Sequence, residues 1–180
     1  EMCIRDRNVD EAKAAHKVGF ELLATGSPGL YRNPDNHPHF EDIIKIRDAC
    51  PYAFMHWGAA DTLYSGLSEA TKVAFMALEH GIDMFYCHNN FDLIKGLYKQ
   101  GIPGLGHVGL VPSRRTWTGG FKAVGKNAKE AINIYEQCLK IQDAGGVAIE
   151  MECVPFKVAE AITKKVEPIV VSMGSGPGCD

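Results

Sequence analysis

Six polar side chains stand at or just beyond the ends of short apolar segments in this sequence. They are Ser27, His56, His88, His107, Glu152 and Ser175. Imidazoles and carboxylates can bind a divalent metal ion or transfer protons at a reacting carbon. The sequence therefore points to acid–base or metal-assisted chemistry, provided that the fold brings these segment ends together.

Glu152 is the candidate general base, because it lies in the otherwise apolar segment AIEMECVP. A carboxylate is costly to bury in such a segment unless it is paired or protonated, so a functional reason for it is expected. In a strand, Glu150 points to the same face as Glu152. Glu150 is either a second acidic group of the site or one partner of a buried ion pair.

The histidines have both structural and functional interpretations. His107 lies in GHVGLVP, where flanking glycines allow a backbone and a ligand to approach closely. It serves either as a catalytic group or as a hydrogen-bonding residue of the fold. His56 and His88 end neighbouring strands and are candidate metal ligands, although no local HxH or HxxxH spacing accompanies them. We expect His37 and His39 to be exposed loop residues.

Two further segments can bind an anion. The GSG turn at 174–176 follows an apolar strand, so its backbone N–H groups can cradle a negative charge and Ser175 can contact a substrate. Arg114 and Arg115 lie in a long loop, where they either clamp a carboxylate or remain solvated. Both features suit a small acidic substrate.

The elements that must position these residues follow a repeating unit, in which a helix ends at a glycine and an apolar strand follows. The helix-ending glycines are Gly19, Gly81, Gly101 and Gly145. The predicted strands occupy residues 20–27, 51–57, 82–90, 102–110, 146–155 and 168–176. Such alternation predicts an α/β fold with a parallel sheet, and chemistry in these sheets collects at the carboxyl ends of the strands.

Hydrophobic spacing at helical periodicity predicts the helices between these strands. They cover residues 10–18, 40–49, 68–80, 91–100, 127–144 and 156–166. Asp10 is the expected N-cap of the first helix. In the longest helix, we expect Ile132, Tyr135, Leu139 and either Ile141 or Gln142 to lie near one face. The segment 111–127 is expected to be a long loop.

Composition excludes several functional classes. The chain is 46% hydrophobic and 23% charged, with a formal net charge of −3. It lacks the basic footprint expected of a nucleic-acid-binding protein. No apolar run approaches the roughly 20 residues that span a bilayer. The six cysteines form no CxxC motif, so reduced thiols and a cytoplasmic location are expected.

The length of the chain suits part of a (β/α)8 TIM barrel. A closed barrel usually needs about 250 residues, whereas this chain has 180. We therefore expect a single partial barrel domain over residues 9–180, cut at both ends. Residues 1–8 match no predicted element and are expected to lie outside the fold.

From Gly101 to Gly176 the chain resembles the ketopantoate hydroxymethyltransferase (3-methyl-2-oxobutanoate hydroxymethyltransferase) family. The resemblance combines a GHVGLVP strand end, a GGFKAVG loop, an MECVP strand end and a GSG turn in the same order. From Asp10 to Gly101 it is weaker but keeps register. The family belongs to the phosphoenolpyruvate mutase/isocitrate lyase group of (β/α) barrels, and the alignment implies barrel strands two to seven.

The resemblance implies an enzyme of pantothenate biosynthesis that transfers a hydroxymethyl group from methylenetetrahydrofolate to an α-ketoacid. In the family, a divalent metal holds the ketoacid and a glutamate removes its C3 proton. Glu152 matches that glutamate, His107 matches the active-site histidine, and Ser27 matches a substrate-binding serine. The resemblance further implies a homo-oligomer with a small-molecule ketoacid as partner.

The sequence departs from the family at the acidic metal site. One metal-binding aspartate of the family falls at Gly26 or Ser27, and the other at His56 or Gly58. The substrate-contacting lysine falls at Tyr86, and a metal-linked glutamate falls at His88. Histidines suit Zn²⁺ better than Mg²⁺, so the expected metal is Mg²⁺ or Zn²⁺ with His56 and His88 as ligands.

Two alternatives follow from the lost carboxylates. One is a lyase or mutase-like enzyme acting on a small oxoacid. The other is a non-catalytic barrel subunit that serves assembly or ligand binding.

Overall fold

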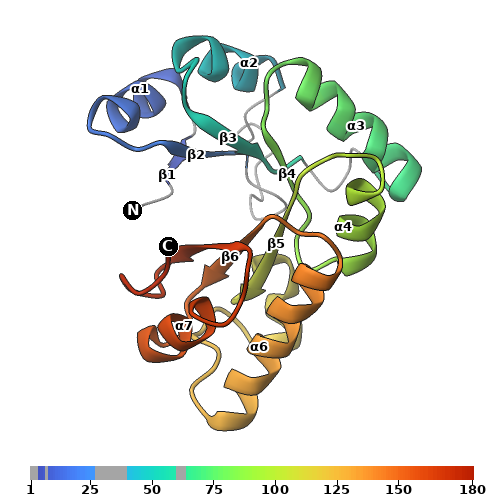
Figure 1. Cartoon of the computed structure of the whole chain (residues 1–180). Coiled ribbons are helices and arrows are strands. Elements are labelled where there is room, and N and C mark those ends of the chain that lie inside the picture. Colours follow the sequence, from blue (N-terminus) through green and yellow to red (C-terminus); the bar gives the residue numbers. More distant parts are fainter. Residues whose placement is uncertain (1–3, 7, 27–39, 60–63) are drawn as a thin grey trace. The chain divides into compact units, whose positions relative to one another are not determined.

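A computed structural model describes residues 4–6, 8–26, 40–59 and 64–180 of the chain. Two compact units are present: an N-terminal unit, residues 2–86, and a C-terminal unit, residues 87–180. Both units consist of parallel strands that alternate with helices (Figure 1). The predicted α/β class is therefore confirmed.

The N-terminal unit contains four strands and three helices among its described residues. They are β1 (Ile4–Asp6), α1 (Val9–Lys17), β2 (Leu22–Thr25), α2 (Phe40–Ala49), β3 (Phe54–Trp57), α3 (Leu67–Glu79) and β4 (Met84–Tyr86). The strands pair in chain order, and every pair is parallel. Strand β1 pairs with β2, whereas the sequence suggests no element within residues 1–8.

Pairing register sorts the side chains of this unit onto two faces of its strands. Ala24 lies opposite His56, and His56 lies opposite Met84, so these residues share one face. Trp57 points to the other face, where its ring lies 4.9 Å from the ring of Phe40 in α2. Figure 1 shows α1 and α2 on one side of β1–β3. His56 therefore faces away from helix α2.

The C-terminal unit continues the same alternation. Its elements are α4 (Phe91–Tyr98), β5 (Gly104–Gly109), a 3-10 turn η3 (Pro112–Arg114), α5 (Arg115–Thr118), α6 (Ala128–Asp143), β6 (Ala148–Glu152), α7 (Phe156–Thr163) and β7 (Ile169–Met173). Strands β5, β6 and β7 pair in parallel in that order. The two short helical turns, η3 and α5, lie in the segment that we expected to be irregular.

The predicted helix-ending glycines have left-handed backbones, because the chain must reverse direction there. Gly19 and Gly145 have φ values of 98° and 86°. After α6, Gly145 N–H donates to the Gln142 carbonyl, and Gly146 N–H donates to the Ile141 carbonyl. This is the Schellman pattern, which satisfies carbonyls left over at a helix C-terminus. Equivalent pairs of hydrogen bonds end α1, α3 and α4.

Asparagines cap three of the helices at their N-termini. The side chains of Asn8, Asn90 and Asn127 accept hydrogen bonds from backbone N–H groups in α1, α4 and α6. The prediction of Asp10 as the first N-cap is wrong, because the N-cap is Asn8, two residues earlier in the chain. A cap must precede the first helical residue, and Asp10 lies inside the first turn.

The packed face of α6 agrees only in part with the predicted one, because Ile141 belongs to it and Ile132 does not. Ile134, Cys138 and Ile141 are buried, whereas Ile132 is 57% exposed. Ile141 lies against β5, where a Cβ added to Gly106 would come within 2.5 Å of its side chain. The glycine thus permits close approach of helix α6. The predicted approach of a ligand at the glycines beside His107 stays a prediction.

None of the described helices is both long and apolar enough to cross a membrane. The five cysteines within the described residues are free thiols.

Candidate functional site

Strand register places three chemically active side chains on one face of the C-terminal unit. His107 in β5 pairs directly with Glu150 in β6, and Gly109 pairs with Glu152. Side chains two residues apart on a strand share a face, and directly paired residues also share it. The prediction that Glu150 and Glu152 point to the same face is confirmed, and His107 joins them there.

This shared face lies opposite the face that is covered by α4 and α6. The alternating residues Gly104 and Gly106 approach Ile94 of α4 and Ile141 of α6. His107 alternates with them along β5, so it projects to the other side. The pattern GLGHVG thus combines close helix packing on one face with a functional group on the other.

The three side chains are close together and largely buried. His107 Nε2 lies 3.1 Å from Glu152 Oε2. One donor atom from each of His107, Glu150 and Glu152 lies within 4.8 Å of the other two. His107 is fully buried, Glu150 is 3% exposed, and the Glu152 side chain is 20% exposed. Glu152 is therefore the carboxylate of the cluster that solvent reaches most easily.

This arrangement permits two kinds of chemistry. An imidazole and a carboxylate at 3.1 Å can exchange a proton, and the partly exposed carboxylate can take one from a ligand. One nitrogen and two carboxylate oxygens within 4.8 Å can also surround a single divalent cation. The donor set therefore fits a metal ion as well as a proton-transfer role.

Asn89 holds the strand end that carries His107, and sequence reasoning missed it. Its Nδ2 donates to the His107 carbonyl at 2.9 Å and to Gln137 Oε1 at 2.8 Å. Its own side-chain and backbone carbonyls each accept a hydrogen bond from Arg114 at 3.0 Å. The polar run HNN directly after an apolar strand was the available signal. The contacts themselves depend on residues far away in the sequence.

The two arginines that we considered as a carboxylate clamp make contacts within the protein. Arg114 binds Asn89. Arg115 donates to the Pro112 carbonyl, and its guanidinium lies 5.7 Å from the ring centre of Phe121. A role for either arginine in substrate binding stays a prediction.

Ser175 lies beside Glu152, but its hydroxyl serves the backbone. The hydroxyl donates to the Met151 carbonyl at 2.8 Å and accepts from Val154 N–H at 3.0 Å. Ser175 is fully buried. These two bonds hold the chain on both sides of Glu152, so the structure gives Ser175 a positioning role. The predicted contact with substrate stays a prediction.

The residue after Glu152 turns the chain sharply at the end of β6. Cys153 has a φ of 52°, a left-handed value that is uncommon outside glycine. Burial raises the pKa of the Cys153 thiol, and the Glu152 charge raises it further. The Cys153 carbonyl accepts from Val124 N–H at 3.1 Å, which ties the loop before α6 to this strand end.

The remaining predicted site residues lie elsewhere in the chain. In the N-terminal unit, the rings of His56 and Tyr86 stack with centres 6.4 Å apart, and both residues are buried. In the C-terminal unit, the His88 carbonyl accepts from His107 N–H at 2.8 Å. The predicted metal pair, His56 and His88, is divided between the units, and its convergence stays a prediction. Ser27, like His37 and His39, lies outside the described residues.

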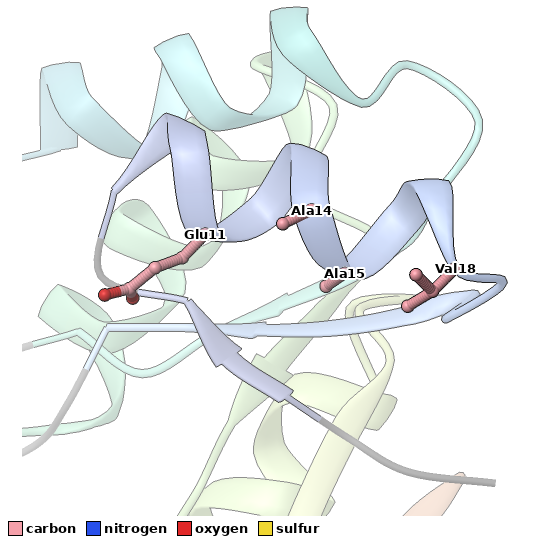
Figure 2. Close-up of a pocket in the computed structure, with 4 residues that line it drawn as sticks. All are labelled: Glu11, Ala14, Ala15 and Val18. Carbon is pink, nitrogen blue, oxygen red and sulfur yellow. The ribbon is translucent and has the colours of Figure 1, made fainter.

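A hollow on α1 offers less chemistry than the β5–β6 cluster. It is lined by Glu11, Ala14, Ala15 and Val18. Figure 2 shows these four side chains along the helix. The lining combines one carboxylate with three apolar side chains and includes no imidazole or thiol. We therefore place the candidate site at the ends of β5 and β6.

Comparison with known proteins links the chain to one enzyme family. Residues 53–180 match the family model described as ketopantoate hydroxymethyltransferase. A 3-methyl-2-oxobutanoate hydroxymethyltransferase of Pyrobaculum neutrophilum is 41% identical over 181 residues, which cover 98% of this chain and 68% of that protein. One of Bdellovibrio bacteriovorus is 35% identical over 111 residues, covering 62% of this chain and 42% of that protein. The chain thus spans less than half the length of the second relative.

Solved structures share the fold at low sequence identity. A putative lyase/mutase from Burkholderia cenocepacia has a TM-score of 0.67 at 13% identity, covering 97% of this chain and 76% of that one. A 2,3-dimethylmalate lyase of the PEP mutase/isocitrate lyase superfamily has a TM-score of 0.59 at 13% identity. The match covers 96% of this chain and 75% of that one. These similarities concern the fold alone.

Proposed function

Because the chain belongs to the ketopantoate hydroxymethyltransferase family, we propose that it transfers a hydroxymethyl group from methylenetetrahydrofolate to an α-ketoacid, with Glu152 as the base. The reaction requires removal of a proton from C3 of the ketoacid, followed by bond formation at that carbon. The observation that carries the proposal is the Glu152 carboxylate at the end of β6. It is partly exposed and lies 3.1 Å from a fully buried histidine.

In this proposal, Glu152 accepts the C3 proton and His107 steadies the carboxylate that takes it. A general base must lie at a fixed position relative to the proton that it abstracts. The backbone bonds of Ser175 on both sides of Glu152 support such a position, as does the bond from Asn89 to the carbonyl of His107. Ser27 and Tyr86 are the proposed substrate contacts.

A divalent cation, when bound, supplies positive charge beside the oxygens of the ketoacid. From the resemblance, His56 and His88 are its proposed ligands. The resemblance also supports the wider proposals that the two units belong to a (β/α)8 barrel, that β2 to β7 correspond to its strands two to seven, and that the whole protein is a cytoplasmic homo-oligomer. The lyase or mutase alternative rests only on likeness of fold, so we rank it second.

The test is exchange of the C3 proton of 3-methyl-2-oxobutanoate in D2O, followed by NMR. We expect Glu152→Gln to slow the enzyme-dependent exchange by roughly 10²- to 10⁴-fold, because the amide cannot accept the proton. The control is Glu136→Gln, on the exposed side of α6, which should exchange at the wild-type rate.

Equal exchange by folded wild-type protein and Glu152→Gln would overturn the assignment of the base. Absence of any exchange by the folded wild type would favour the alternative of a non-catalytic subunit. Exchange that depends on Glu152, with no product formed from methylenetetrahydrofolate, would favour the lyase or mutase alternative.

A further inference from the structure

Glu150 is a buried carboxylate that the proposed reaction does not use. It lies in the middle of β6 and pairs with His107 in β5 and with Val171 in β7. Only 3% of its surface is exposed. One of its oxygens lies within 4.8 Å of donor atoms of both His107 and Glu152. A residue with this burial and these neighbours calls for a physical explanation.

The charges of the cluster favour a cation. Two carboxylates and one imidazole carry a net negative charge even when the imidazole is protonated. Keeping carboxylates near one another in a buried place costs free energy unless protons or a positive ion compensate. A divalent cation between the three donor atoms would compensate both carboxylates at once.

The donor types indicate which cations fit. Mg²⁺ prefers oxygen ligands in near-octahedral geometry and keeps several waters. One imidazole nitrogen with two carboxylate oxygens suits Mn²⁺, Fe²⁺, Co²⁺ or Zn²⁺ better. The sheet holds the ligands in advance, because the backbones of His107 and Glu150 are paired in the ladder and Asn89 also binds the His107 carbonyl.

We infer that His107, Glu150 and Glu152 form a binding site for one divalent transition-metal ion. The site uses other residues than the His56/His88 pair suggested by the resemblance. A carboxylate has two oxygens, so ligation through one oxygen of Glu152 is compatible with proton transfer at the other. The inference stands apart from the proposed function, because metal binding can be measured without substrate.

The test is titration of the metal-free protein with Mn²⁺, followed by the EPR signal of the free ion. We expect one bound Mn²⁺ for this cluster, and an affinity at least about tenfold lower in Glu150→Gln, since an amide is a weaker ligand than a carboxylate. Glu136→Gln serves as the matched control. In the His56→Ala/His88→Ala double variant, binding at this site should persist.

A second measurement does not depend on whether Glu150→Gln folds. Electron spin echo spectra of bound Mn²⁺ should show coupling to an imidazole nitrogen, and His107→Gln should abolish that coupling while circular dichroism remains that of the wild type. Mn²⁺ affinity in folded Glu150→Gln equal to that of the wild type would overturn the inference. So would the absence of Mn²⁺ binding by the wild type, or a nitrogen coupling that disappears only in the His56/His88 variant.

Discussion

At the scale of single residues, the site depends on how the end of β6 is held. Glu152 lies between two backbone groups that bind the Ser175 hydroxyl. The hydroxyl donates to the Met151 carbonyl and accepts from Val154 N–H. The serine is fully buried, so water cannot replace its hydroxyl without a rearrangement. The position of the proposed base is thus coupled to Ser175, which lies on the turn after β7.

We expect Ser175→Ala to lower the free energy of unfolding by about 1–3 kcal/mol, because a buried N–H and a buried carbonyl each lose a partner. Urea unfolding followed by circular dichroism measures this change. Ser113→Ala, at an exposed position, is the control and should leave stability unchanged. If Ser175→Ala instead raises the KM for the ketoacid at unchanged stability, the original prediction of substrate binding is the better one.

At the scale of elements, strand β5 is organised by its alternation of small and functional residues. Gly106 faces Ile141 of α6, and an added Cβ would lie 2.5–2.9 Å from three side-chain carbons of that isoleucine. His107 points to the opposite face. The distance between helix and strand is therefore set by the absence of a side chain at Gly106, one residue before His107.

Gly106→Ala should destabilise the protein by about 1–3 kcal/mol, because a methyl group has to fit into a filled core. The same substitution is made in an Ile141→Ala background, which lacks the side-chain carbons that the added methyl group would meet. A double-mutant cycle in urea should show a smaller cost of Gly106→Ala in that background. The same cost in both backgrounds would show that contact with Ile141 is not the cause.

The N-terminus of α6 holds the loop that reaches the site. Glu130 Oε2 accepts from the N–H groups of Gly125 and Lys126 at 3.0 and 2.9 Å. The N–H of Glu130 in turn donates to Asn127 at the N-cap. This pattern is a variant of the capping box, in which the carboxylate binds the N–H groups of the two residues before the N-cap instead of the N–H of the N-cap itself. The neighbouring Val124 N–H donates to the Cys153 carbonyl, so the cap secures the loop beside the end of β6.

The capping box predicts a dependence of stability on pH. The hydrogen bond from Lys126 N–H, followed by that from Gly125, lowers the pKa of Glu130 below its ordinary value of 4.5. A lowered folded pKa means that the ionised group stabilises the fold above pH 4.5, and that this contribution is lost as the pH falls through the folded pKa. At pH 7, the wild-type protein should therefore unfold at a higher urea concentration than Glu130→Gln.

We expect that difference in midpoint to shrink as the pH is lowered from 5 towards 3, because protonated Glu130 resembles glutamine in charge. Urea titrations of both proteins across this interval measure it. Glu136→Gln, which alters an exposed carboxylate of the same helix, corrects for general effects of charge. A difference that stays constant with pH would argue against the ionised cap.

At the scale of the whole molecule, the predicted site residues are divided between two compact units. His56 and Tyr86 belong to the N-terminal unit, whereas His107, Glu150 and Glu152 belong to the C-terminal unit. The C-terminal unit thus holds both the proposed base and the proposed cation site. Because a ligand that binds only the folded state stabilises it, the cation should act on the stability of this unit.

Mn²⁺ at about 100 times its dissociation constant should raise the free energy of unfolding by about 2.7 kcal/mol. We expect the melting temperature to rise with Mn²⁺ concentration, and amide hydrogen exchange to slow most in β5 and β6. Glu150→Gln should show neither effect. A rise in melting temperature of the same size in that variant would place the stabilising ion elsewhere.

The backbone of this fold could largely be predicted from sequence, whereas the contacts of the site could not. All six predicted strands are present inside their expected ranges, and α2 covers the predicted residues 40–49. By contrast, the buried face of α6 was predicted only in part: Ile141 is buried as one of the expected residues, but Ile134 is buried in place of Ile132. Both isoleucines fit a helical stripe until packing against the strands selects one of them. Asn89 and Ser175 have roles that depend on residues at least 18 positions away.

Sequence alone thus determined the alternation of β2 to β7 with the main helices, the glycines that end four of those helices, and the family. Glycine conformations, apolar periodicity and motif order are local properties, and local interactions suffice to express them. Tertiary structure alone decided that His107 meets Glu150 and Glu152, and that Ser175 binds backbone. Those contacts depend on the register between β5 and β6 and on the turn after β7. Register arises from packing across strands that lie about 40 residues apart in the chain, so no local pattern records it.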